Sequence, residues 1–203
     1  AQAGWSVIGT CRDRADAEKL EALGEVRAEL LDMRDRPALA AFGQRLGGAP
    51  LDLFIANAGI TAPDSMTSAE DGDRFLEVLA VNSVAPTLLA VSLRPNVVRA
   101  KGKMVAITSE MGSIARNASG GWLAYRASKS ALNSAWRTLA IEMAADPIAI
   151  AMLHPGWVKT DMGGRGAPLE APESVRAMRQ VIDRLSARHK GVYFNYRCET
   201  LPW

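Results

Sequence analysis

The sequence predicts an α/β fold in which a single parallel β-sheet is covered by helices on both faces. Two observations lead to this fold class. Short segments rich in Val, Ile and Leu alternate with longer segments of helical periodicity along the chain. Clusters of Gly, Pro and Asp separate these segments. Strands that alternate with helices favour parallel pairing, because each helix returns the chain to the start of the next strand.

The expected elements follow from these patterns in chain order. Strands are expected at residues 5–11, 26–32, 51–56, 103–108, 148–153 and 191–196. Helices are expected at residues 15–23, 37–46, 68–100, 124–145 and 173–186. Gly24 ends the first helix, and Pro37 stands in the first turn of the second, where proline is tolerated. The long helix is expected to break or bend near Pro86 and Pro95.

Length and composition limit the domain count and the kinds of partner. With 203 residues, 48% of them apolar, the chain is expected to form one domain over residues 1–203. Its net charge of +2 favours neither nucleic acid nor a membrane surface as a partner, and no apolar run approaches the ~20 residues of a membrane helix. Cys11 and Cys198 lie far apart and without metal-binding spacing to His154 or His189. Reduced thiols, a cytoplasmic location and no metal site are therefore expected.

Tyr125 and Lys129 are the leading candidates for catalysis. They stand four residues apart in the helix expected at 124–145, so they share one helix face. A neighbouring ammonium favours the phenolate, so Lys129 is expected to lower the pKa of Tyr125 from its ordinary ~10. Ser109 follows the strand at 103–108, at the sheet edge where open α/β folds bind ligands. A Tyr-x-x-x-Lys pair alone is also typical of a solvated helix face.

Further motifs accompany this pair in a fixed order. They are Asn57-Ala58-Gly59 after one strand, Asn82 inside the long helix, and Pro155-Gly156-Trp157-Val158 after a later strand. Together with the strand-end serine and the Tyr-x-x-x-Lys pair, they resemble the short-chain dehydrogenase/reductase family over nearly the whole chain. The stretch 109–114 and the ending 201–203 are most similar to its carbonyl-reductase and C-factor branch. The resemblance implies a Rossmann-like, doubly wound sheet.

The resemblance also implies an oxidoreductase that passes a hydride between a nicotinamide and a small carbonyl or alcohol substrate. Tyr125 would be the acid or base, Lys129 would hold the nicotinamide ribose, and Ser109 would orient the carbonyl. Asn82 is unusual in a helix interior, and in the family this residue distorts the helix and helps to hold a relay water. Ser113 is the alternative to Ser109, which we prefer for its place at the strand end.

The cofactor residues implied by the resemblance follow successive strands. Arg12 stands where an acidic residue would bind the ribose of NAD, and an arginine there can pair with the 2′-phosphate of NADP. We therefore expect NADP rather than NAD, with a solvated loop arginine as the alternative. Asp32, beside Met33, matches the adenine position of the family, or it only caps the turn after its strand. The other expected contacts are Asn57, Ala58, Gly59, Tyr125, Lys129, Pro155, Gly156, Val158 and Thr160.

The strand, Gly-rich turn and helix that open the family fold are not represented in this sequence. Residues 1–4 resemble the end of that helix, so the domain is expected to be N-terminally truncated. The turn would bind the pyrophosphate, and its strand would lie in the middle of the sheet. We expect the working protein to contain this segment. The alternatives are a rearranged sheet, or a cofactor-free binding or signalling protein on the same fold.

The substrate pocket and the assembly are also inferred from the resemblance. Four side chains near the catalytic positions in sequence are expected to border an apolar pocket: Met111, Trp122, Trp157 and Met162. His154 is expected to be a core or loop residue. By analogy with the family, a homodimer or homotetramer is expected to form through the helices at 68–100 and 124–145.

Overall fold

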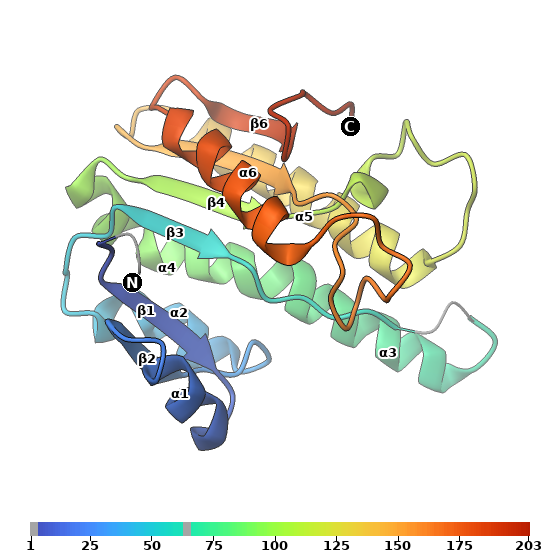
Figure 1. Cartoon of the computed structure of the whole chain (residues 1–203), viewed down its shortest axis with the longest axis horizontal. Coiled ribbons are helices and arrows are strands. Elements are labelled where there is room, and N and C mark those ends of the chain that lie inside the picture. Colours follow the sequence, from blue (N-terminus) through green and yellow to red (C-terminus); the bar gives the residue numbers. More distant parts are fainter. Residues whose placement is uncertain (1–3, 63–65) are drawn as a thin grey trace.

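A computed structural model describes residues 4–62 and 66–203, so the helix end expected at residues 1–4 lies mostly outside the described residues. Strands and helices alternate as expected (Figure 1). The strands are β1 (Val7–Cys11), β2 (Val26–Leu30), β3 (Leu53–Ala56), β4 (Lys103–Ile107), β5 (Ala149–His154) and β6 (Lys190–Asn195). The α-helices are α1 (Arg14–Glu21), α2 (Arg36–Arg45), α3 (Ala69–Leu79), α4 (Ala85–Ala100), α5 (Leu123–Glu142) and α6 (Ala171–Arg184).

All the strand pairs are parallel, which confirms the predicted fold class, but the hydrogen-bonded ladder is in two parts. β1 pairs with β2, and β3, β4, β5 and β6 pair in that order. β1 and β3 are the inner edges of the two parts and run in the same direction (Figure 1). Within residues 4–62 and 66–203, no strand pairs with either inner edge. The gap between them falls in the middle of the sheet, where the strand of the opening segment of the family fold was expected.

Side chains from one strand alternate between the two faces of the four-stranded part, as the period of two requires. Met104 and Ala106 of β4 pack with buried residues of α4 and α5, including Val97 and Trp136. Val105, between them, packs on the opposite face in a cluster that includes Val181 and Ile182 of α6. The sheet is therefore covered on both faces, as in a doubly wound fold.

Helices α2 and α4 connect the two parts of the ladder. Leu39 and Phe42 of α2 form a buried cluster with Leu89 and Leu93 of α4, and both Ile8 of β1 and Phe54 of β3 pack against it. The two helices approach closely at Gly43, where an added Cβ would lie 2.0 Å from the backbone oxygen of Ser92. Tight helix packing thus holds β1 and β3 in one molecule although they do not pair.

The long helix is interrupted near Pro86, one of the two positions predicted. A π-helical turn at Ala80–Val84, which ends two residues before Pro86, joins α3 to α4, with the amide N–H of Ala85 donating to the carbonyl of Ala80. Pro86 follows in the first turn of α4, and Pro95 lies inside that helix without ending it. Asn82 is at the centre of the π-helical turn and is fully buried.

By length and composition alone, the continuous helical stretch Ala69–Ala100 could cross a membrane, contrary to the expectation that no segment approaches that length. Half of its most apolar window is buried inside the molecule. A core helix that packs against α2 and the sheet is buried on most of its sides. Such a helix is also apolar on most of its sides, which explains its composition.

Candidate active site

Helix α5 carries Tyr125 and Lys129 in its first two turns. The Lys129 side chain runs into the interior, where its Nζ donates to the carbonyl oxygen of Ile107 at 2.9 Å, at the end of β4. The same Nζ lies 5.8 Å from the centroid of the Tyr125 ring. Lys129 is only 4% exposed, so the pair is not a solvated helix face. The expected proximity of ammonium and phenol is present.

The electrostatics of this pair differ from the sequence-based expectation. Burial raises the pKa of the Tyr125 phenol, and hydrogen bonding with Ser109 acts in the opposite sense without cancelling it. Burial also lowers the pKa of Lys129 to about 8. The raised pKa of Tyr125 is opposite in direction to the lowering that was expected from Lys129. Tyr125 is held in its protonated form, the form that can donate a proton.

Asn82 lies against the catalytic pair. Its Oδ1 accepts a hydrogen bond from the N–H of Ile60 at 2.8 Å, and its Nδ2 donates to the Ile60 carbonyl at 2.8 Å and to Ser128 Oγ at 2.9 Å. A Cβ added at Gly59 would lie 3.4 Å from Asn82 Oδ1 and 3.6 Å from Lys129 Nζ. The Asn-Ala-Gly segment, the π-helical turn and the Tyr-Lys helix therefore meet at one point.

Ser109 is the serine that the structure brings to Tyr125. It is buried, it follows β4, and its hydroxyl accepts a hydrogen bond from the N–H of Met111 at 3.1 Å at the start of a short 3-10 turn, Glu110–Gly112. Ser113 lies beyond this turn and accepts from the N–H of Arg116 at 3.3 Å. Because hydrogen bonding from Ser109 affects the Tyr125 pKa, the geometry favours Ser109 over Ser113.

Helix α5 can approach this turn because residue 112 is glycine. A Cβ there would lie 2.9 Å from both the carbonyl carbon and the Cβ of Lys129 and 3.0 Å from Asn133 Nδ2. The Gly112 carbonyl also accepts a hydrogen bond from Ser130 Oγ at 3.0 Å. The Tyr-x-x-x-Lys spacing places Lys129 on the same face of α5 as Tyr125. The absence of a side chain at Gly112 lets this face approach Ser109 closely.

The segment after β5 closes another side of the site. The Pro155 carbonyl accepts a hydrogen bond from Ser174 Oγ at 2.6 Å, which ties it to α6. Gly156 has φ of +87°, and a Cβ there would lie 2.8 Å from Leu169 Cδ2, so the position requires glycine. Val158 forms a parallel bridge with Leu169, and Thr160 Oγ1 accepts from the N–H of Gly163 at 3.0 Å.

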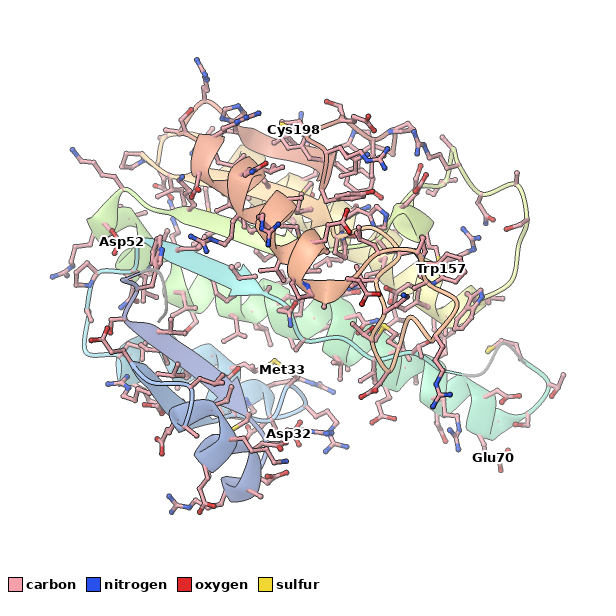
Figure 2. All side chains as sticks on the ribbon, in the orientation of Figure 1. Asp32, Met33, Asp52, Glu70, Trp157 and Cys198 are labelled. Carbon is pink, nitrogen blue, oxygen red and sulfur yellow. The ribbon has the colours of Figure 1, made fainter. Side chains whose placement is uncertain are left out.

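The residues expected to bind the adenosine end lie at β1 and β2. Arg12, exposed after β1, makes no ion pair within the described part of the chain. Asp32 accepts hydrogen bonds from the backbone N–H of Arg34 at 2.8 Å and from its guanidinium, which lower the Asp32 pKa to about 2. Asp32 therefore caps the turn after its strand, as the alternative to the adenine contact predicts. Figure 2 shows Asp32 and Met33 near the end of the two-stranded part.

Met33 borders a cavity of about 290 Å³ between this turn and the long helix. Its lining residues are Met33, Arg34, Arg36, Leu76, Glu77, Ala80 and Val84. Arg34 also reaches Glu77 at 3.5 Å, so a charged pair closes one side of the cavity. Asn57 and Ala58, at the end of β3, are exposed and can be approached by a ligand.

Of the side chains expected to border a substrate pocket, Trp122, Trp157 and Met162 are exposed. Trp157 lies beside the start of α6 (Figure 2), and its indole N–H donates to the Gly163 carbonyl at 2.8 Å. A second cavity of about 310 Å³ opens beside it. Its lining residues are Glu110, Arg116, His154, Gly156, Trp157, Asn195, Tyr196, Arg197 and Glu199.

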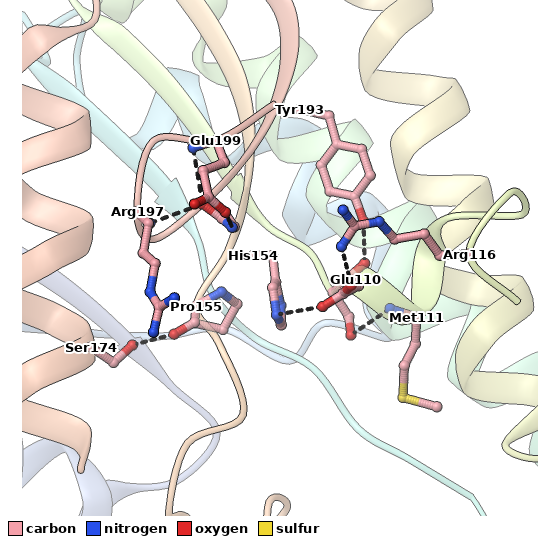
Figure 3. Close-up of polar contacts among 11 residues, drawn as sticks. Glu110, Met111, Arg116, His154, Pro155, Ser174, Tyr193, Arg197 and Glu199 are labelled. Atoms are coloured by element: carbon pink, nitrogen blue, oxygen red, sulfur yellow. Dashed lines mark hydrogen bonds and ion pairs between the residues drawn. The ribbon is translucent and has the colours of Figure 1, made fainter. Parts of the chain in front are cut away.

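Sequence reasoning missed the polar residues of this second cavity. Glu110 forms an ion pair with Arg116 and lies 3.7 Å from His154 Nε2 (Figure 3). Burial lowers the pKa of His154 to about 4, so its imidazole is neutral near pH 7. The sequence motif on this segment ends at Ser109. The residues that line the second cavity lie at or beyond the ends of three different strands, β4, β5 and β6, so no local pattern groups them. Within residues 4–62 and 66–203, no group of three or more His, Cys, Asp or Glu side chains could hold a metal ion.

Fold and site geometry together define the class of this protein. The short chain dehydrogenase family model matches residues 1–168, and the chain belongs to this family of oxidoreductases. Among curated relatives, C-signal of Myxococcus xanthus is 37% identical over 166 residues, which are 81% of this chain and 100% of that protein.

Solved structures agree with the sequence match. The carbonyl reductase Sniffer of D. melanogaster is 32% identical with a TM-score of 0.89, over 97% of this chain and 87% of that one. A carbonyl reductase from Pseudomonas aeruginosa PAO1 in complex with NADP is 33% identical with a TM-score of 0.85, over 100% of this chain and 90% of that one. The chain therefore has carbonyl-reductase-like relatives, one of which was solved with NADP.

Proposed function

We propose that this protein is an NADP-dependent oxidoreductase that interconverts a small carbonyl compound and the corresponding alcohol. The observation that carries the proposal is the convergence of Tyr125, Lys129, Ser109 and Asn82 around the end of β4. When bound, the nicotinamide supplies or accepts the hydride. The chain itself supplies the proton, the orientation of the substrate and the charge that stabilises the phenolate.

Tyr125 is the proton donor in reduction. Its raised pKa keeps the phenol protonated, and the proton passes to the carbonyl oxygen as that oxygen gains negative charge. The ammonium of Lys129 then lies near the phenolate and favours it. Ser109 donates a second hydrogen bond to the substrate oxygen and fixes its position. In the oxidation direction the same phenol, once deprotonated, takes the proton from the alcohol.

Asn82 acts through its backbone rather than through its amide. Both amide protons and one lone pair of its side chain are already used by Ile60 and Ser128. Pro86, four residues later, has no N–H and cannot donate to the Asn82 carbonyl as a regular α-helix would require. This carbonyl is therefore the group we assign to the relay water that returns a proton toward Lys129.

Several residues fit the two ends of NADP. The exposed Arg12 offers a guanidinium for the 2′-phosphate that makes no ion pair among the described residues, and the neighbouring Asp13 caps α1 by accepting from the N–H of Asp16 at 2.9 Å. Met33 borders an apolar cavity for the adenine. At the other end, Gly156 and Thr160 present backbone and hydroxyl groups to the nicotinamide, and Asn57, Ala58 and Gly59 leave room for the ribose and phosphate between them.

The pyrophosphate requires one more element. The inner edges of β1 and β3 are unpaired within the described residues, and both strands contact the same α2 and α4 cluster. We propose that the active enzyme contains a strand between them, followed by a Gly-rich turn and a helix whose N-terminus binds the pyrophosphate. This strand would also satisfy the backbone groups of both edges, which are costly to leave unpaired.

Titration with NADPH and NADH tests the proposal. Protein of verified mass is followed by quenching of tryptophan fluorescence and by energy transfer to the reduced nicotinamide, for the 203-residue chain and for a chain extended by a strand, a Gly-rich turn and a helix. We expect the extended chain to bind NADPH more tightly than NADH, with Arg12→Ala reducing that difference. Absence of binding to either cofactor by the extended, folded chain would contradict the proposal.

A cofactor-free signalling protein on this fold is the second candidate. The observation in its favour is the 37% identity to a relative named C-signal, whose full length is matched within this chain. This candidate predicts no change in fluorescence with either nicotinamide. It offers no reason for the buried, hydrogen-bonded arrangement of Asn82 and Lys129, which is why we prefer the enzyme.

We also propose a cytoplasmic homodimer or homotetramer that uses the long helices. Leu76 of α3 and Ile141 of α5 are 65% and 62% exposed, and Val91 of α4 is also exposed. If these side chains belong to one contiguous apolar patch, such a patch is typical of an interface. Light scattering on the purified protein measures the assembly, and a strict monomer at micromolar concentration would contradict it.

A further inference from the structure

Tyr193, on β6, contacts the backbone of the candidate catalytic serine, Ser109. Its side chain is 1% exposed, and its hydroxyl donates a hydrogen bond of 2.5 Å to the backbone carbonyl of Ser109. Figure 3 shows Tyr193 reaching toward the turn that carries Glu110 and Met111. Burial raises the pKa of Tyr193 to about 12, so the phenol remains a donor at any working pH. No sequence motif places these two residues together, since they are 84 positions apart.

The opposite side of the Tyr193 ring is covered by the last residues of the sequence. Trp203 stacks on the ring with centroids 5.5 Å apart and planes inclined by 28°. The N–H of Leu201 donates to the Tyr193 carbonyl at 2.8 Å, and the Trp203 carbonyl accepts from the N–H of Ala115 at 3.0 Å. Residues 201–203 therefore touch both Tyr193 and the loop that follows Ser109.

These contacts define the position of the Ser109 backbone. The N–H of Thr108, the preceding residue, donates to the Leu153 carbonyl at 3.0 Å as the parallel ladder ends. Beyond that point the Ser109 carbonyl accepts two hydrogen bonds, one from Tyr193 and one from the N–H of Gly112 at 2.8 Å. Since the side chain and the carbonyl share one Cα, a shift of this peptide after loss of the Tyr193 contact, with Gly112 as its remaining partner, would move the Ser109 hydroxyl relative to Tyr125.

We propose that Tyr193 is a positioning residue that fixes the Ser109 hydroxyl for the substrate carbonyl, with Trp203 holding the Tyr193 ring in place. The inference rests on the proposed function, because it assigns Ser109 to the substrate oxygen. Tyr193 touches neither substrate nor cofactor in this role. Its effect passes through Ser109 alone.

A double-mutant cycle tests this coupling. Tyr193→Phe keeps the ring and its stacking on Trp203 and removes only the hydroxyl. It is compared with Ser109→Ala, with the double variant, and with Thr138→Val, which removes an exposed hydroxyl that donates to the Ser134 carbonyl at 3.0 Å on α5. Reduction of a panel of aliphatic and aromatic ketones by NADPH gives kcat and KM, fluorescence titration gives cofactor affinity, and crystal structures of the wild type and of Tyr193→Phe locate Ser109.

We expect Tyr193→Phe to lower kcat about tenfold, as loss of a positioning contact does, with cofactor affinity unchanged. In the Ser109→Ala background the same change should have no further effect, because coupled residues are not additive. Thr138→Val should leave kcat unchanged. In the crystal structure of Tyr193→Phe, Ser109 Oγ should be displaced from Tyr125.

Equal losses from Tyr193→Phe in both backgrounds, or an unmoved Ser109 in the variant structure, would overturn the inference. If Ser109→Ala retains full kcat while Tyr125→Phe is inactive, the enzyme proposal stands and the Ser109 assignment falls together with the inference. If the extended chain with the wild-type site, folded, neither binds NADPH nor reduces any ketone, the proposed function is contradicted first. The crystal structures still decide whether Tyr193 positions Ser109.

Discussion

Asn82 donates a hydrogen bond of 2.9 Å to Ser128, which lies on α5 between the candidate acid Tyr125 and Lys129. Ser128 in turn donates to the Tyr125 carbonyl at 2.8 Å. A π-helical turn and the first turns of α5 are thereby connected inside the protein. This buried connection links the stability of the molecule to the geometry of its site.

Asn82→Ala should destabilise the protein and lower turnover by shifting the backbone carbonyl of position 82, which the substitution keeps. It leaves the N–H and carbonyl of Ile60 and the hydroxyl of Ser128 without their partner, at ~1–3 kcal/mol for each buried group left unsatisfied. The matched control is Asn96→Ala on α4, where a buried amide donates to the Ala49 carbonyl at 2.8 Å. Urea unfolding and kcat are measured for both. Equal losses of kcat would show that Asn82 has only a structural role.

Tyr125→Phe should nearly abolish turnover while leaving cofactor affinity largely intact. The change removes the hydroxyl that exchanges the proton, and the ring keeps its place near Lys129. Loss of a general acid typically costs about 10²- to 10⁴-fold in rate. Steady-state NADPH oxidation and fluorescence titration measure the two quantities on the same sample. Retention of more than half of the activity would exclude Tyr125 as the acid.

The reduction rate should fall as pH rises through about 8. The buried Lys129 has a pKa of about 8, so its ammonium is present below that pH and is lost above it, and the neutral amine no longer stabilises the Tyr125 phenolate. The pH profile of kcat/KM reports this group in the free enzyme. Lys129→Arg keeps the positive charge, and its profile should fall only at higher pH. A wild-type profile that stays flat to pH 10 would refute the assignment.

Cys198→Gly should stabilise the protein by about 1 kcal/mol, because a non-glycine residue in the left-handed region costs roughly that amount. Cys198 has φ of +67° in the turn after β6, and it is exposed. Cys198→Ala removes the thiol but keeps the Cβ, so it serves as the control and should leave the stability near that of the wild type. Thermal unfolding in the presence of a reductant compares the three proteins. Equal gains from both substitutions would attribute the effect to the thiol.

Local patterns predicted the order of strands and helices and the residues that converge at the site. The Tyr-x-x-x-Lys spacing is a property of one helix, and the strand-end position of Ser109 is a property of one segment, so both could be read from neighbouring residues. The ends of elements moved by one to three positions, as for β1, which begins at Val7 rather than at residue 5, and α5, which ends at Glu142 rather than at residue 145. Such shifts reflect where a strand finds a partner, which the local sequence does not specify.

The features that sequence reasoning missed depend on tertiary contacts. The long helix was expected to break or bend near Pro86 and Pro95, and it is interrupted just before Pro86 but not at Pro95. The π-helical form of the interruption, in which Asn82 finds partners at Ile60 and Ser128, was not predicted. Lys129 was expected to lower the pKa of Tyr125, but the depth of burial, which no motif encodes, raises it. Tyr193 was not recognised because its partner at Ser109 comes from a different strand.

The π-helical turn at Ala80–Val84 makes the length of this segment as important as its composition. A π-helical turn holds one residue more than an α-helical turn, and each residue of an α-helix advances the side-chain direction by about 100°. Deleting one residue between Ala80 and Val84 would therefore rotate α3 by about that angle relative to α4. Buried Val78 would turn away from the interior while the chemistry of every remaining residue stayed the same. Across homologues, substitutions should accumulate in this segment more readily than single-residue deletions.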